Sequence, residues 1–191
     1  TKKNLIKKLY NQNIHCEEIT DRPNALKVLK RVNIFKTIEF KLGFFELQDA
    51  SSQLVAKFLD VSAKHKFLDA CAGAGGKTLH IASILNNKGN IIATDIHEYK
   101  LQELKKIDRR NGSHNITTKV IDNTFIKKNK NKFDRVLIDA PCSGFGVIRR
   151  NPDSKWKLNP KNFNSILNDQ IKILNDYSKL VNDNGIMLYV T

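Results

Sequence analysis

Hydrophobic and polar residues alternate in regular blocks over most of the chain, from Lys66 onward. Short apolar runs are separated by longer segments whose apolar positions recur with helical spacing. The predicted strands are residues 67–71, 90–94, 117–121, 133–138 and 186–190, and the predicted helices are residues 77–85, 98–110 and 162–181. Strands that alternate with helices are typical of βαβ units, so the pattern predicts a doubly wound, mostly parallel α/β sheet.

The first forty-two residues follow a different pattern. It predicts a helix over residues 4–13, a strand over 14–19, a helix over 23–31 and a strand over 34–40. This fragment is too small to bury a core of its own. Gly43 interrupts the pattern, and a helix is predicted to begin near Asp49. We therefore expect a small N-terminal α/β fragment, residues 1–42, and a larger domain, residues 43–191.

A glycine-rich turn follows the first strand of the larger domain. Residues 71–78 (CAGAGGKT) end that strand and open the next helix. Such a turn lets the backbone approach a ligand closely at the helix N-terminus. Asp95 ends the next strand, where its carboxylate can accept hydrogen bonds from ribose hydroxyls. Together these features predict a site for a nucleotide-like cofactor.

Three kinds of cofactor come into question for this turn. Its ending, Gly-Gly-Lys-Thr, resembles a P-loop in which Asp139 would be the acid that binds Mg²⁺, but a P-loop requires glycine at the position of Cys71. A dinucleotide fits the spacing, but hydride transfer would make no use of the Pro-Cys pair described next or of the positive charge. An adenosine-type cofactor without a polyphosphate fits best.

Residues 139–144 (DAPCSG) follow the predicted strand 133–138. Ligand and catalytic groups gather at the carboxyl ends of parallel strands, so we expect Asp139 and Cys142 beside the cofactor. A cysteine at the start of a loop is expected to be reactive; the alternative is a buried cysteine that acts as a small hydrophobe. The long connection that follows, residues 141–161, is typical of a functional loop.

The composition favours a polyanionic partner. The 191 residues include 33 Lys and Arg against 19 Asp and Glu, a formal net charge of +14. Nucleic acid is the first such partner, and a charge that serves only solubility is the alternative. The three cysteines, at positions 16, 71 and 142, have no metal-site spacing, so we expect no metal. No apolar run has the ~18 residues of a membrane helix, which predicts a cytoplasmic protein without a membrane partner.

Several motifs, in the right order, resemble those of the Sun/RsmB-like RNA (cytosine-5-)-methyltransferases. They are residues 67–78 (FLDACAGAGGKT), 93–95 (ATD), 120–122 (VID), 134–144 (DRVLIDAPCSG), 149–153 (RRNPD) and Trp156. Residues 43–55 (GFFELQDASSQLV) resemble the segment that leads into the catalytic domain of that family. The resemblance implies a Rossmann-like methyltransferase sheet, S-adenosylmethionine as the cofactor, and methylation of carbon 5 of cytosine in RNA, ribosomal RNA above all.

The resemblance also implies roles for individual residues. The cofactor would be held by the loop residues Cys71, Ala72, Gly73, Ala74, Gly75, Gly76 and Lys77. Asp95 would bind its ribose, and Asp122 would lie by its adenine. Asp139 would lie between the methyl donor and the target base, while Cys142 would help to release the methylated product. RNA would be bound by a channel lined by Arg149, Arg150 and Asp153, and residues 1–42 would form part of an RNA-binding subdomain.

Two features depart from the family pattern. The family loop usually carries proline at the position of Ala74, so the turn is expected to be looser here. In the family, the attacking cysteine follows a threonine at the end of the fifth strand, and this sequence ends at Thr191. The 191 residues are therefore expected to form a sheet truncated after its fifth strand, and to bind the cofactor without methylating RNA.

Two other hypotheses stay open. One is an RNA-binding module without catalysis. The other is a cytosine methyltransferase in which Cys142 itself attacks the base, as a Pro-Cys thiol does in DNA cytosine methyltransferases. The oligomeric state is open as well.

Overall fold

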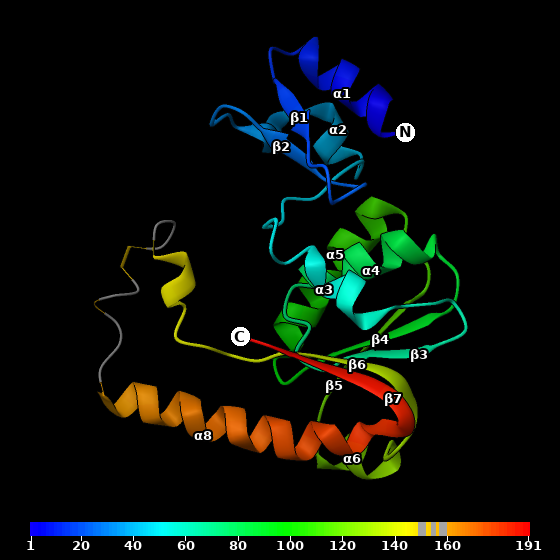
Figure 1. Ribbon diagram of the computed structural model, residues 1–191, viewed down its shortest axis with the longest axis vertical. Coiled ribbons are helices and arrows are strands. Elements are labelled where there is room, and N and C mark those ends of the chain that lie inside the picture. The colour runs from blue at the N-terminus through cyan, green and yellow to red at the C-terminus, as the bar shows by residue number, and fades with distance from the viewer. Residues whose placement is uncertain (149–151, 154–155, 157–159) are drawn as a thin grey trace.

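The computed structural model describes residues 1–148, 152–153, 156 and 160–191. Its main part is a five-stranded sheet in the order β5-β4-β3-β6-β7, in which every neighbouring pair is parallel (Figure 1). The strands are β3 (Lys66–Asp69), β4 (Asn90–Asp95), β5 (Ile116–Val120), β6 (Phe133–Asp139) and β7 (Val181–Val190). Because β3 is central, the chain winds outward from it to both edges, and the predicted doubly wound α/β sheet is confirmed.

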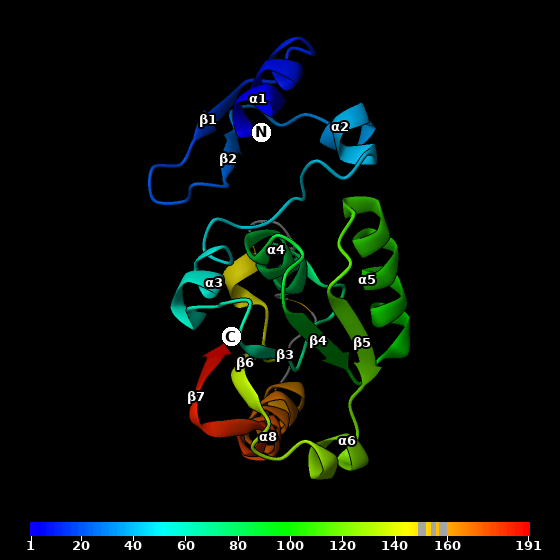
Figure 2. The same ribbon diagram turned by 90° about the vertical axis from the view of Figure 1, so that its right-hand side faces the viewer.

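Helices cover both faces of the sheet (Figures 1 and 2). One face carries α3 (Leu54–Leu59), α4 (Gly76–Leu85) and α5 (Glu98–Asn111), and the other carries α6 (Asn123–Lys128), α8 (Pro160–Tyr177) and the 3-10 helix η3 (Ser178–Leu180). In β3, Phe67 packs with the α3 and α4 side chains and Leu68 with those of α6 and α8. Both side chains are fully buried. This two-sided burial explains why the central strands are continuous apolar runs.

The N-terminal fragment contains two corrections to the predicted elements. It consists of α1 (Lys2–Tyr10), β1 (Cys16–Glu18), β2 (Leu26–Val28), the 3-10 helix η1 (Ile34–Lys36) and α2 (Ile38–Lys41). The predicted helix over 23–31 is wrong, because a turn at Arg22 lets residues 26–28 pair antiparallel with β1. The predicted strand over 34–40 is wrong too, because the Thr37 hydroxyl accepts the Phe40 N–H and starts a helix.

The C-terminal boundaries also differ from those predicted. The last helix ends at Tyr177, so residues 178–181 belong to η3 and the start of β7. Strand β7 is longer than predicted because its early part still pairs with β6, with a shift in register between Phe133 and Arg135. Helix α6 was not predicted; the carboxylate of Asp122 starts it by accepting the Phe125 N–H.

The N-terminal fragment and the sheet domain meet at the C-terminal end of α5. The guanidinium of Arg110 lies 4.1 Å from the ring centre of Phe40 and pairs with the Glu46 carboxylate. Gly43 has φ +74°, and a β-carbon there would lie 2.1 Å from the Arg110 carbonyl oxygen. Glycine is therefore required at this contact. The division into residues 1–42 and 43–191 stays a prediction.

Candidate active site

The loops that carry the predicted site residues begin side by side. Strands β3 and β6 are neighbours, yet the chain leaves them toward opposite sides of the sheet, the arrangement at which open α/β sheets bind ligands. The Ala70 N–H donates to the Leu137 carbonyl at 2.8 Å, and the Ala140 N–H donates to that of Val190 at 2.9 Å. The carboxyl ends of β3, β6 and β7 are thereby joined.

The glycine-rich loop is folded tightly against α5. The Gly75 N–H donates to the Ala72 carbonyl at 2.9 Å. Gly75 has φ +91°, and a β-carbon there would lie 2.5 Å from Cγ of Leu104. Among the described residues no side chain caps the start of α4, so N–H groups of its first turn are available to a ligand.

Replacing Gly75 with alanine is expected to lower the free energy of unfolding by about 2–4 kcal/mol, because a left-handed alanine is strained and its methyl group collides with Leu104. Gly76→Ala is the matched control, since a β-carbon at Gly76 has no neighbour within 4 Å. Urea denaturation of both variants measures the effect. Equal stability of the two variants would contradict this account of the turn.

Asp95 holds the glycine-rich loop and the following turn together. Its Oδ2 accepts the Gly73 N–H at 3.0 Å, and its Oδ1 accepts the His97 N–H at 2.8 Å. The Lys100 ammonium lies 3.9 Å from Oδ2. Each carboxylate oxygen has a further lone pair, so Asp95 can still accept a hydrogen bond from a ligand hydroxyl.

Asp69, at the end of β3, lies behind the loop. Its Oδ2 accepts the Thr78 hydroxyl at 2.6 Å, while its Oδ1 has no hydrogen-bond partner among the described residues. Burial raises the pKa of Asp69 to about 7, against the lowering effect of the Thr78 hydrogen bond. Sequence reasoning assigned Asp69 and Thr78 no role, although an acid that ends a buried strand is a signal for one.

Lys77 and Asp139 join the two loops at the centre of the site. The Lys77 ammonium lies 2.5 Å from Oδ2 of Asp139. The pair connects the first turn of α4 with the end of β6, and the side chain of Asp139 is 36% exposed. Asp139 is therefore open to a ligand on one side while Lys77 fixes it on the other.

The two cysteines of the site have opposite environments. Cys71 is partly buried against the core, and burial, with nearby carboxylates, raises its pKa to about 12, so it stays a thiol at neutral pH. Cys142 is exposed on the loop after β6. The Gln170 side chain of α8 donates to the Pro141 carbonyl at 2.8 Å and fixes the start of that loop. Of these two thiols, Cys142 is the accessible one.

Of the remaining predicted residues, Asp122 and Asp153 fall within the described part of the chain. Asp122 is exposed after β5, where one carboxylate oxygen caps α6. Asp153 is exposed, and its carbonyl accepts the Trp156 N–H at 3.1 Å. Arg149 and Arg150 lie outside the described residues.

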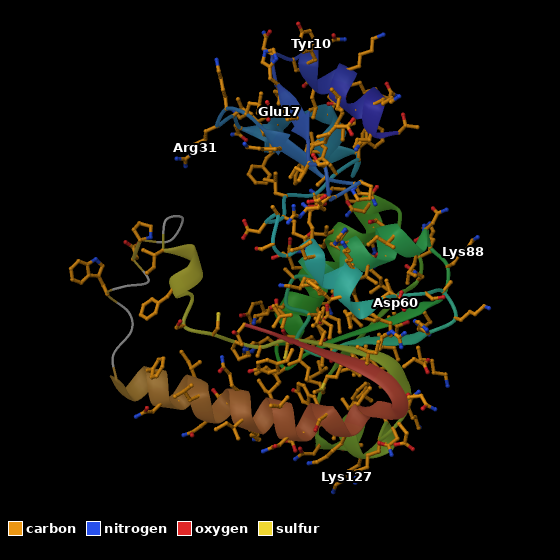
Figure 3. All side chains as sticks on the ribbon, in the orientation of Figure 1. Tyr10, Glu17, Arg31, Asp60, Lys88 and Lys127 are labelled. Carbon is orange, nitrogen blue, oxygen red and sulfur yellow. The ribbon has the colours of Figure 1, made fainter. Side chains whose placement is uncertain are left out.

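The basic charge is spread over the molecule. Arg31, Lys88 and Lys127 project from three separate regions (Figure 3). Within the described part of the chain, no helix is long and apolar enough to cross a membrane, and no group of three or more His, Cys, Asp or Glu side chains is arranged to hold a metal.

Comparison with known proteins identifies the family. The family described as 16S rRNA methyltransferase RsmB/F matches residues 56–191. The Bacillus subtilis (strain 168) protein "Probable ribosomal RNA small subunit methyltransferase B" is 37% identical over 192 residues, covering 98% of this chain and 42% of that protein. This chain thus spans about two fifths of the length of that relative.

Two solved structures are similar over most of the chain. The crystal structure of PH0851 has a TM-score of 0.90 at 28% identity and covers 98% of this chain and 43% of its own. The structure of NSun6 from Pyrococcus horikoshii with SFG has a TM-score of 0.76 at 28% identity and covers 86% of this chain and 43% of its own. The resemblance seen in the sequence motifs is confirmed: the chain belongs to the RsmB/F family of rRNA methyltransferases and has its Rossmann-like fold.

Proposed function

We propose that this chain forms the cofactor-binding and base-binding part of an enzyme that methylates carbon 5 of cytosine in ribosomal RNA, with S-adenosylmethionine as the methyl donor. The observation that carries the proposal is the pairing of Lys77 with Asp139. It joins a glycine-rich turn to a loop with an exposed Cys142, in a chain of the RsmB/F family.

The residues at the carboxyl ends of the strands fit the cofactor. The free N–H groups at the start of α4 suit a carboxylate, and the spare lone pairs of Asp95 suit ribose hydroxyls. Asp122 follows β5, the strand beside β4, and we assign it to the adenine of the cofactor. When bound, S-adenosylmethionine supplies an electrophilic methyl group on a sulfonium.

The chemistry of cytosine requires a thiolate. Carbon 5 is a poor nucleophile until a thiolate adds to carbon 6 and makes the ring enamine-like. The family motif places that cysteine directly after Thr191. Val190 pairs with Asp139 in the sheet, so a residue at that position would lie at the same edge as Cys142.

Asp139 and Cys142 then have separate roles. The Asp139 carboxylate, held by Lys77, accepts a hydrogen bond from the amino group of cytosine and so orients the ring. After carbon 5 has accepted the methyl group, Cys142, as its thiolate, takes the carbon 5 proton; the C–H electron pair re-forms the ring double bond, and the carbon 6–sulfur bond breaks to release the attacking cysteine as a thiolate. The base must leave its stack to reach these groups, and we assign Arg149, Arg150 and Asp153 to the RNA path.

The cofactor assignment is tested by calorimetry. We expect S-adenosylmethionine or its demethylated product to bind the chain, and Asp95→Ala to weaken binding by about 1–3 kcal/mol through lost ribose hydrogen bonds. Asp183→Ala, an exposed acid in β7, is the control and is expected to bind as the wild type does. A folded wild-type chain that gives no heat with either ligand would favour the RNA-binding module over the enzyme.

A further inference from the structure

A cleft of about 530 Å³ lies between the turn at residues 21–24, helix α3 and helix α4. Its volume is within the range of ligand sites, about 300–1,000 Å³. The lining has an apolar part that includes Pro23, Leu54 and Ile84, and a polar part that includes Arg22, Gln53 and His80. None of these residues was given an individual role by the sequence motifs, although Gln53 and Leu54 belong to the family-like segment 43–55.

Helix α4 connects the cleft with the proposed reaction centre. Lys77, His80 and Ile84 follow each other on α4 at spacings of three and four residues, so they share one face of the helix. Lys77 reaches Asp139; His80, about one helical turn (~5.4 Å) further along this face, and Ile84, about two turns further, line the cleft. The next nucleotide of an unstacked strand can span such a separation. A second connection is made by Gln48, whose side chain donates to the Gly76 carbonyl just before the chain enters the cleft at Gln53.

The polar side chains of the cleft have free hydrogen-bonding groups. Arg22 donates through Nε to the Ala50 carbonyl at 2.8 Å, which fixes its guanidinium while its terminal nitrogens have no partner among the described residues. The side chains of Gln53 and His80 likewise make no hydrogen bond within the described part of the chain. Burial lowers the pKa of His80, so its ring is neutral near neutral pH and can both donate and accept.

The charge of the cleft favours a base over a phosphate. Arg22 and Lys57 are balanced by Asp21 and Asp60 in the lining, so the cleft carries no strong positive excess. A neutral ring with polar edges matches an apolar surface bordered by an amide, an imidazole and a guanidinium. The backbone phosphates would then remain outside, in solvent.

We propose that this cleft binds the base of the nucleotide next to the target cytosine in single-stranded RNA. The base stacks on the apolar surface of Leu54 and Ile84, while Gln53, His80 and Arg22 contact its edge. This inference rests on the proposed function, since it places the target base at Lys77 and Asp139. The preference of the protein for a particular base beside the cytosine then depends on the cleft between the N-terminal fragment and α4.

The test measures binding of a fluorescent single-stranded RNA with one central cytosine among uridines. Versions that lack the base of one uridine in turn, with the phosphate retained, are compared by anisotropy. For the wild type, we expect loss of one particular base beside the cytosine to weaken binding about tenfold, as loss of one stacked base does. In His80→Ala and in Gln53→Ala, this penalty is expected to shrink to about twofold or less.

His114→Ala, at an exposed histidine before β5, is the matched control and should keep the full penalty. Thermal melting and cofactor calorimetry establish that each variant is folded; Gln53 is half-buried and stands just before α3, and His80 is half-buried on α4. An unchanged penalty in both folded cleft variants, or a wild type with no base-specific penalty, would overturn the inference. Loss of cofactor binding in the wild type with the RNA results intact would instead overturn the proposed function.

Discussion

Replacing Cys142 with alanine is expected to make a covalent protein–RNA adduct accumulate, in a chain extended past Thr191 by the cysteine and the segment that the family carries there. The added thiolate can still attack carbon 6 and the methyl group can still transfer, but the carbon 5 proton has lost its acceptor. Loss of a general base lowers turnover by about 10²–10⁴-fold. Denaturing gels show the adduct, and transfer of tritiated methyl groups to RNA measures the turnover.

Cys16→Ala is the matched control, because Cys16 is half-buried in β1 and far from the site in sequence. It is expected to turn over normally without trapped RNA. If Cys142→Ala prevents adduct formation, or if the 191-residue chain methylates RNA as fast as the extended chain, Cys142 is the attacking thiol. The roles assigned to the two cysteines would then be reversed.

Replacing Asp69 with asparagine is expected to remove a large pH dependence of stability between about pH 4 and pH 7. Burial raises the pKa of Asp69 from 3.8 to about 7 in the folded chain. Over that window the folded state holds the proton more tightly than the unfolded state, so the free energy of unfolding falls as the pH rises. The loss amounts to about 4 kcal/mol once the carboxyl is ionised.

Asparagine keeps an oxygen that can accept the Thr78 hydroxyl and carries no charge at any pH. Asp69→Asn is therefore expected to be more stable than the wild type above about pH 7. Its free energy of unfolding should not fall as the pH rises through this range. Urea denaturation across this range measures the difference, with Asp183→Asn as the exposed control. Parallel pH profiles for the wild type and Asp69→Asn would mean that Asp69 is ionised without cost in the folded chain.

The motifs were predictable because they stand at fixed places relative to the strands. Asp95, Asp139 and Cys142 each end or follow a buried apolar run, and parallel strands bring their carboxyl ends to one edge. The interaction partners of these residues were harder to predict from the sequence. Lys77 and Asp139 are separated by 62 positions, and their contact follows from β3 and β6 being neighbours, which strand order alone decides.

The sequence by itself determined the type and order of the sheet elements, since strands buried on both faces must be continuously apolar and helices between them must keep one apolar side. Tertiary contacts decided the N-terminal fragment. Residues 26–28 become a strand because β1 offers a partner, and the helix at residues 38–41 places its Phe40 ring against Arg110 of α5. The same holds for the cleft, whose walls come from a turn, α3 and α4. Short segments have too little local preference to choose a structure, so packing against distant residues chooses it for them.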